Sequence, residues 1–266
     1  RPAAYCGIVG CKPTWGRVSV YGIHPVSFSL DHPGPFTRSV ADTALLLRII
    51  AGADPHDPLC SDAPVPDYPA ALTRPLTRPP RIGRIRPYFQ ETADDAMGAA
   101  VENAADVFQS NGAGMTDVAL PESFSDLHRM HRTIMLTEAA ACHAAQFKTH
   151  KSDYSPGIRS LIEEGLSLSA VEYADARRHQ LVFHSEIQTA FADLDLLLTP
   201  ATLTPAPKDL TTTGDPAFNA PWSYAGLPTV VLPAGCSQEG MPVGVQLVAP
   251  RGDDAFGTGW AQARDA

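Results

Sequence analysis

The sequence predicts an α/β fold in which a mixed β-sheet is sandwiched between helices and is incomplete on its N-terminal side. Three observations predict it: a strand–helix–strand pattern between residues 81 and 120, a helix-rich segment from about 122 to 192, and two successive apolar strands near the C-terminus. With 266 residues, 44% of them hydrophobic, the chain can bury a sizeable core as one large or two small domains.

The first 38 residues alternate short β-rich pieces, Ile8–Val9 and Arg17–Tyr21, with Gly and Pro. Such backbone is typical of a segment that passes close to a site. Ser39-Val-Ala-Asp42 then resembles a capping box and predicts a helix that ends at Gly52. Residues 53–80 are rich in Pro and Asp and lack periodicity, so we expect an exposed connection there.

The strand–helix–strand pattern begins with a strand over Arg81–Arg86 and ends with a second over Met115–Leu120. Between them, apolar residues recur at offsets of 0, 3, 4, 7, 8 and 11, which places them on one face of a helix closed by Asn111-Gly112. They are Met97, Ala100, Val101, Ala104, Ala105 and Phe108. A β-α-β unit of this kind favours a right-handed connection and a parallel or mixed sheet.

The middle of the chain is predicted to be a helical layer. One helix covers roughly 123–150, a short one follows Pro156, and a long one starts at the capping box Ser169-Ala-Val-Glu172. After it, Asp195-Leu-Leu-Leu-Thr-Pro200 reads as a strand covered on both faces. Residues 211–218 are a polar loop, and two paired strands follow. The strands of the sheet are therefore expected near 82–86, 115–119, 194–199, 228–233 and 243–248.

Composition excludes several classes of partner. The formal charge of −9 comes with singly scattered Lys and Arg, so no basic stripe could follow a phosphate backbone, and direct nucleic-acid binding is not expected. No apolar stretch reaches the ~20 residues that a membrane-spanning helix needs. Five dispersed cysteines fit reduced core residues of a cytoplasmic protein. Nothing in the sequence decides between a monomer and a homodimer.

Motifs of several enzyme classes are absent from the sequence. It contains no phosphate-binding loop, no dinucleotide-binding turn and no Gly-x-Ser-x-Gly elbow. His128 and His131 lie on adjoining helix turns but lack a nearby third ligand, so we expect neither a metal site nor a cofactor. The pairs Glu163-Glu164 and Asp94-Asp95 face apart on helices, which favours solvated charges over shared acid–base chemistry.

Lys12 has two interpretations. A desolvated lysine can act as a base, whereas a lysine at the end of a strand more often bridges to backbone carbonyls. We favour the bridging role.

Several motifs in order resemble the amidase signature family. They are Arg1-Pro-Ala-Ala-Tyr-Cys-Gly7, Val9-Gly-Cys-Lys-Pro-Thr14, Gly16-Arg-Val-Ser19, Ser29-Leu-Asp31, Gly34-Pro35, Arg38-Ser-Val-Ala-Asp42, Leu197-Leu-Thr-Pro200, Gly214-Asp-Pro-Ala-Phe-Asn-Ala-Pro-Trp222, Gly226-Leu-Pro228 and Gly240-Met-Pro-Val-Gly-Val-Gln-Leu247. The resemblance covers nearly the whole chain. It implies the amidase signature fold, with residues 1–266 as the C-terminal portion of a single domain.

The resemblance also implies a catalytic triad that precedes these residues. The family motif Gly-Gly-Ser-Ile-Arg-x-Pro-Ala ends at Arg1-Pro2-Ala3, which places its nucleophilic serine about three residues before Arg1. The bridging serine and the lysine of the triad lie further upstream. Since Arg1 is not a natural translation start, we expect a missing upstream part and no catalytic residue within 1–266. The fragment alone is therefore expected to be inactive, with an unprotected sheet edge and an open apolar cleft beside residues 1–20.

Three residues are candidates for substrate binding under this resemblance. Thr213 and Asn219 are polar contacts and Trp222 is an apolar wall, although Asn219 could instead cap a helix and Trp222 could fill the core. Glu138 lies on an apolar helix face, where it either orients a pocket residue or forms an ordinary salt bridge.

Three functions remain open. The first is a stand-alone amidase that cleaves a small carboxylic amide through a seryl acyl-enzyme. The second is the glutamine-hydrolysing component of a tRNA-dependent glutamyl or aspartyl amidotransferase. As the resemblance implies it, that component carries a tyrosine and an arginine where this chain has His131-Arg132 and Ser160-Leu161, with Arg159 displaced, so a free carboxylate lacks its bidentate partner. The third is a non-catalytic scaffold.

Overall fold

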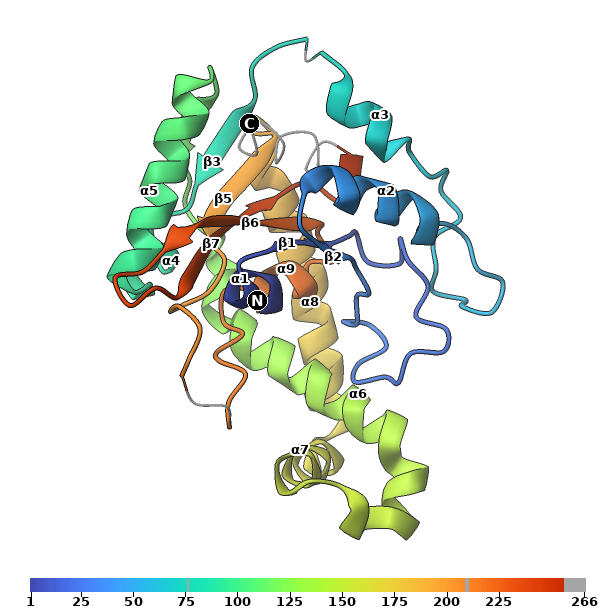
Figure 1. Ribbon diagram of the computed structural model, residues 1–266. Helices are drawn as coiled ribbons and strands as arrows, with labels where there is room; N and C mark the ends of the chain where they lie inside the picture. Colours follow the sequence, from blue (N-terminus) through green and yellow to red (C-terminus); the bar gives the residue numbers. More distant parts are fainter. Residues whose placement is uncertain (76, 209–210, 256–266) are drawn as a thin grey trace.

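The computed structural model describes residues 1–75, 77–208 and 211–255, and it contains one seven-stranded mixed sheet with helices around it (Figure 1). The strand order is β2-β1-β6-β7-β5-β3-β4. The strands are β1 (Val9–Lys12), β2 (Phe36–Thr37), β3 (Arg81–Arg84), β4 (Gly114–Asp117), β5 (Leu196–Pro200), β6 (Thr229–Cys236) and β7 (Pro242–Val248). The predicted α/β class is confirmed, and all five expected strands are present.

The β-α-β unit forms as the apolar periodicity predicts. Strands β3 and β4 pair in parallel, and α5 (Asp95–Ser110) connects them. The buried side chains of α5 are the six that define the predicted face. Asp94 caps the helix by accepting a hydrogen bond from the backbone N–H of Ala96, and Gly112 follows its end at φ 91°.

The centre of the sheet combines segments that are far apart in the sequence. All five residues of β5 are buried, and β5 pairs in parallel with β3 and antiparallel with β7. Strand β6 is antiparallel to β7 on one side and to β1 on the other, where Gly10 lies opposite Val231. The first strand of the chain is therefore held by one of the last.

The helical layer also follows the prediction. It consists of η1 (Glu122–Asp126), α6 (Leu127–His150), η2 (Lys151–Asp153), α7 (Pro156–Ser167) and α8 (Ala170–Ala190). Ser169 and Glu172 form the expected capping box of α8. Helix α7 packs on α6 where Gly165 meets the backbone of Leu136: a Cβ at residue 165 would lie 2.1 Å from the Leu136 carbonyl oxygen. In Figure 1, α7 and the C-terminal end of α6 lie together below the sheet.

One part of the N-terminal third differs from the prediction. Residues 2–6 form a helix, α1 (Pro2–Cys6), which has Pro at its first position and ends at Gly7 with φ 62°. A five-residue window is too short for periodicity to reveal such a helix. The β-rich piece over residues 17–21 pairs only at Val18, through a single bridge to Ala51, so the backbone there is irregular.

The expected exposed connection over residues 53–80 is partly structured. It contains α3 (Tyr68–Thr73), which is capped by Asp67 and buries the Tyr68 ring completely. The helix before it, α2 (Val40–Ile50), has Ser39 as its N-cap, as predicted. One tyrosine therefore anchors a segment whose composition resembles that of a loop.

Strand β2 forms one edge of the sheet, and several apolar side chains on it and on α2 are exposed. Phe36 on β2 is 55% exposed, and Ile49 on α2 is 69% exposed. Leu45, Leu46 and Ile50 of α2 are exposed as well, and so are Tyr21, Ile23, Val26 and Phe28 in the loop before β2. That this edge lacks protection stays a prediction. The hollow beside the first residues, described below, is lined by more apolar than polar surface.

The five cysteines form no disulfide. Only Cys11 is buried, whereas Cys6, Cys142 and Cys236 are exposed, so the expectation that all are core residues is wrong. Over the described ranges, no helix is both long enough and apolar enough to cross a membrane.

Candidate active site

A cavity of about 260 Å³ lies on one face of the sheet beside the first residues of the chain. Strands β1, β6 and β7 contribute Lys12, Thr229 and Gln246 to its lining. The loop before β2 contributes His32, and the short helix α9 (Ala220–Tyr224) contributes Trp222. Segments from both ends of the chain therefore build one concave surface.

Lys12 holds α9 against strand β1. Its Nζ donates hydrogen bonds to the carbonyl oxygens of Trp222 (3.2 Å) and Leu227 (2.5 Å). Burial lowers the pKa of Lys12 to about 7, since the enclosed nitrogen loses hydration that favours its charged form. These contacts confirm the predicted role of a strand-end lysine that bridges to carbonyls.

Gln246 fixes the chain on the opposite side of the cavity. It is 1% exposed, and its Nε2 donates to the carbonyl oxygens of Phe218 (2.8 Å) and Pro200 (3.1 Å). The residue after Phe218 is Asn219, and its Nδ2 donates a hydrogen bond to the carbonyl oxygen of Ala201 (2.9 Å). Asn219 is therefore held by the loop after β5.

Trp222 stacks on a rigid aromatic neighbour. Its ring lies 5.7 Å from that of Phe89 at an interplanar angle of 12°, and the residue is fully buried. The end of the same helix is attached to α8: the carbonyl oxygen of Tyr224 accepts hydrogen bonds from Gln180 Nε2 and His184 Nε2, both at 2.8 Å. Helix α8 thus sets the position of α9.

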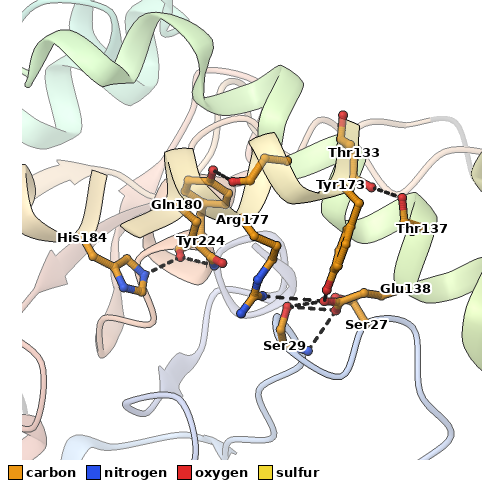
Figure 2. A network of polar contacts seen from close by, with 11 residues as sticks. Ser27, Ser29, Thr133, Thr137, Glu138, Tyr173, Arg177, Gln180, His184 and Tyr224 are labelled. Carbon is orange, nitrogen blue, oxygen red and sulfur yellow. Dashed lines mark hydrogen bonds and ion pairs between the residues drawn. The ribbon is translucent and has the colours of Figure 1, made fainter. Parts of the chain in front are cut away.

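The buried carboxylate of Glu138, on α6, fixes the loop on the other side of the cavity (Figure 2). Two of its contacts come from α8. Ser27 Oγ donates to Glu138 Oε2 (2.5 Å), while Ser29 donates through Oγ to Oε1 (2.7 Å) and through its backbone N–H to Oε2 (3.0 Å). From α8, Tyr173 OH donates to Oε1 (2.8 Å) and Arg177 Nη1 lies 3.6 Å away. Glu138 therefore fixes the loop over residues 27–29 and forms an ion pair with Arg177, while its role in orienting a pocket residue stays a prediction.

His32 presents one nitrogen without a partner. Its Nδ1 contacts the carbonyl oxygen of Leu30 at 2.6 Å, while its buried Nε2 has no hydrogen-bond partner among the described residues. Burial, followed by the field of Lys12, holds the pKa of His32 well below its usual value, so the ring is neutral near pH 7.

The histidine pair on α6 has a structural role. His128 Nε2 contacts Tyr88 OH at 2.8 Å, and the ring of His131 packs 6.1 Å from that of Tyr224.

Tyr88 adopts φ 65° and ψ −57°, and the backbone N–H of Phe89 donates a hydrogen bond to the carbonyl oxygen of Pro87. This arrangement is a strained γ-turn. No group of three metal-ligating side chains occurs in the part of the chain that the structure describes.

We expect the free energy of unfolding to fall as the pH decreases from about 6.5 to about 4, in part because of His131. Burial lowers the pKa of His131 from 6.5 to about 4. In this window the unfolded chain binds a proton at this residue and the folded chain does not, so acid favours unfolding by up to about 3 kcal/mol. Urea unfolding at pH 7.0, 5.5 and 4.5 measures the effect. The variant His131→Phe should show a flatter pH dependence, and an unchanged slope would contradict the assignment.

The structure brings together two of the three predicted substrate-binding residues. Asn219 and Trp222 line the cavity, and Trp222 is also part of the core, as its alternative interpretation predicts. Asn219 is the N-cap residue of α9 without a capping hydrogen bond from its side chain. Thr213 is exposed and is not among the residues that line the cavity. The role of each in substrate binding stays a prediction.

Sequence reasoning missed His32 and Gln246. A signal existed for Gln246, because it is a single amide in an otherwise apolar strand, where a buried polar group needs defined partners. None existed for His32, whose loop is fixed at Ser29 by Glu138, 109 positions further along the chain.

The sequence model of the amidase family matches residues 1–256. The chain belongs to this family. It is 37% identical over 269 residues to a Mycobacterium tuberculosis protein named "Putative amidase AmiD", with 95% of this chain and 54% of that protein covered. It is 36% identical over 282 residues to a component of the glutamyl-tRNA(Gln) amidotransferase of Prochlorococcus marinus, with coverage of 94% and 57%. The chain therefore spans a little more than half the length of the curated relatives it matches.

Solved amidase structures share the fold. A structure described as a vestigial protein complex, which reveals the origins of an s-triazine catabolic enzyme, has a TM-score of 0.89 at 29% identity, covering 99% of this chain and 59% of that one. Substrate-bound 6-aminohexanoate cyclic dimer hydrolase has a TM-score of 0.85 at 25% identity, with coverage of 98% and 61%. The cavity described above therefore lies within an amidase fold.

Proposed function

We propose that this chain supplies the substrate-facing part of an enzyme that hydrolyses a carboxylic amide to an acid and ammonia or an amine. The observation that carries the proposal is the cavity between His32, Lys12 and Trp222, set in a chain that matches the amidase family over residues 1–256. In this proposal, residues 1–266 are the C-terminal portion of a single domain. The five free thiols fit a cytoplasmic location.

The nucleophile in this proposal is a serine that precedes Arg1 in the full-length protein. A serine hydroxyl needs a base to take its proton, and a desolvated lysine acting through a bridging serine can provide one. The match of Arg1-Pro2-Ala3 to the end of the family motif supports this, as does the greater length of the relatives. In this proposal the lysine of the cavity, Lys12, has a different role, in which its nitrogen bridges the carbonyl oxygens of Trp222 and Leu227 and holds α9.

A second candidate is the glutamine-hydrolysing component of a tRNA-dependent amidotransferase, which the relative from Prochlorococcus marinus favours. Glutamine presents a free carboxylate, and a bidentate guanidinium is its usual partner. Here Arg159 Nη2 donates to the carbonyl oxygens of Tyr154 (3.2 Å) and Ser152 (3.4 Å), and Arg132 pairs with Glu164 at 2.6 Å. Neither arginine lines the cavity, so we favour the stand-alone amidase.

The test compares ammonia release by the full-length protein from glutamine, propionamide and benzamide. We expect turnover of a neutral amide to exceed that of glutamine by at least tenfold. Residues 1–266 alone should give neither turnover nor labelling by a serine-directed covalent probe, because losing a triad costs several orders of magnitude. Labelling of the shorter chain would place the nucleophile inside it. Preferred turnover of glutamine would favour the amidotransferase, and a full-length protein inactive on every amide would favour a scaffold.

A further inference from the structure

We infer that Lys12 holds α9 as a neutral amine, and that proton uptake by Lys12 loosens α9 and with it one wall of the cavity. The inference comes from the hydrogen bonds of an enclosed lysine, from the ionisable groups around it and from a carboxylate near the other end of the chain. Its consequence for catalysis rests on the proposed function, whereas the pH dependence of α9 does not.

The partners of Lys12 Nζ match a neutral amine. Its hydrogen bonds go to the carbonyl oxygens of Trp222 and Leu227, and within the described ranges none goes to a carboxylate. A neutral amine has two N–H groups for these two acceptors, whereas an ammonium has a third that would be buried without a partner among them. The lowering of the pKa of Lys12 by burial, to about 7, agrees with this match.

The ionisable groups near Lys12 come from several segments. The thiol of Cys11, its neighbour on β1, is neutral near pH 7 because burial raises its pKa to about 12. His32 is neutral as well, since burial and then the field of Lys12 lower its pKa. Arg1 lines the same cavity and already donates to a backbone carbonyl, and from α9 comes Tyr224, whose pKa is raised by burial. These groups therefore offer Lys12 no negative charge near pH 7.

The carboxylate that acts on Lys12 belongs to Asp254, which follows β7. Its Oδ1 and Oδ2 accept hydrogen bonds from the backbone N–H (2.6 Å) and the Oγ1 (2.8 Å) of Thr14, and Arg17 Nε lies 3.9 Å from Oδ2. The same segment brings in the guanidinium of Arg251. Burial is the largest influence on the pKa of Lys12, and the negative charge of Asp254 opposes part of it. Asp254 therefore favours proton uptake by Lys12.

The direction of the pH effect follows from a comparison of two states of α9. With α9 in place the pKa of Lys12 is about 7, and once α9 is released water reaches Nζ and the pKa returns toward 10.5. Between these values release takes up a proton, so each unit of rising pH favours the held state by up to about tenfold. Below about pH 7 Lys12 is charged in both states and the effect levels off. Helix α9 is therefore held least firmly in acid.

Release of α9 changes the shape of the cavity without any contact between Lys12 and a ligand. Trp222 lies in α9 and lines the cavity, and Asn219 immediately precedes the helix and lines it too. The carbonyl oxygen of Trp222 also accepts a hydrogen bond from the backbone N–H of Leu227 (2.9 Å), so Lys12 closes the same turn. The exchange of the Leu227 amide therefore reports the state of the bridge.

Hydrogen exchange of the full-length protein tests the bridge directly. Mass spectrometry follows peptides that contain residues 222–227 at pH 6 and pH 8, and each rate is divided by that of the unfolded peptide at the same pH. We expect protection to be about tenfold greater at pH 8 than at pH 6. In Lys12→Met this ratio should be about tenfold smaller, because no proton is taken up there. In Asp254→Asn, which keeps an oxygen for Thr14 but loses the charge, the ratio should increase, because Lys12 then stays neutral to lower pH.

Two exposed residues provide matched controls for the exchange experiment. Lys208→Met removes a lysine that is 74% exposed, and Asp193→Asn removes the charge of a carboxylate that is 97% exposed. Both should leave the ratio unchanged. An equal ratio in the parent protein and in Lys12→Met would overturn the inference. If Lys12→Met does not fold, an unchanged ratio in Asp254→Asn would overturn it instead.

The KM of the full-length protein for propionamide tests the consequence for the cavity. On going from pH 8 to pH 6, we expect KM to rise about twofold more in the parent protein than in Lys12→Met. An equal change in both would show that the bridge does not affect the cavity and would overturn that part of the inference. Absence of turnover with any amide would refute the proposed function, while the exchange measurement would still decide whether α9 responds to Lys12.

Discussion

Replacing Glu138 by leucine is expected to lower the free energy of unfolding by about 3–5 kcal/mol. The carboxylate is 1% exposed and accepts hydrogen bonds from Ser27, Ser29 and Tyr173, with Arg177 nearby. Leucine fills a similar volume but leaves these donors and the guanidinium without their acceptor. A buried donor that loses its partner costs the full desolvation of that group, which is why the effect exceeds that of an exposed ion pair.

Urea unfolding followed by circular dichroism measures the Glu138 effect. The variant Glu138→Gln keeps one acceptor oxygen, so its loss should be smaller, about 1–2 kcal/mol. The matched control is Glu163→Leu on α7, whose carboxylate pairs with Lys151 at 2.5 Å but is 47% exposed, and which should change stability by less than about 0.5 kcal/mol. Similar losses for Glu138→Leu and Glu163→Leu would show that the buried network contributes no more than a surface pair.

The Glu138 variants should also change catalysis in the full-length protein. Because Ser27 and Ser29 lead directly to His32, loosening them moves a wall of the cavity without touching the ligand. We therefore expect Glu138→Gln to raise KM for propionamide more than it lowers kcat, at a temperature where the variant is fully folded. A purely structural role would leave both constants unchanged under that condition.

Gly165→Ala is expected to lower the free energy of unfolding of α7 by about 1–3 kcal/mol. The added Cβ would lie 2.1 Å from the Leu136 carbonyl oxygen and 2.8 Å from the Ala140 Cβ. Rotation of a side chain cannot relieve a contact with backbone, so α6 and α7 must separate. Hydrogen exchange of the α7 amides reports this directly, because α7 is expected to open before the sheet does.

Gly98→Ala is the matched control for this substitution. Gly98 also lies within a helix, but nothing is within 4 Å of the position its Cβ would take. Alanine there should stabilise the protein by about 0.4–1 kcal/mol through helix propensity and the unfolded chain. A loss with Gly98→Ala, or unchanged exchange in α7 with Gly165→Ala, would show that the close approach of the two helices does not limit stability.

The prediction from sequence succeeded where a local pattern determines the structure. The buried face of α5 follows from apolar spacing alone, and Ser39 and Ser169 mark helix starts because their side chains bond to nearby backbone. It failed at α3, where burial of Tyr68 depends on distant residues rather than on the Pro-rich segment around it.

The candidate site was accessible from the sequence only in part. Asn219 and Trp222 were selected through resemblance, and the cavity does include them. His32 is positioned instead by the carbonyl oxygen of Leu30, and Glu138 fixes the nearby loop through Ser27 and Ser29. No spacing rule connects positions 27 and 29 to position 138, so only the folded structure reveals this contact.

The pairing of β1 with β6 has a consequence for how the protein is made. Strand β1 can pair early with β2, where Gly10 lies opposite Phe36, but its other partner, β6, is synthesised more than 200 residues later, where Val231 lies opposite Gly10. At about 5–20 residues per second, that interval is on the order of 10–45 seconds. During translation, the side of β1 that pairs with β6 remains without its native partner, while the β3-α5-β4 unit can already close. The segment around β1 is therefore expected to need protection by chaperones until β6 has been synthesised, and the sheet is completed in a late step.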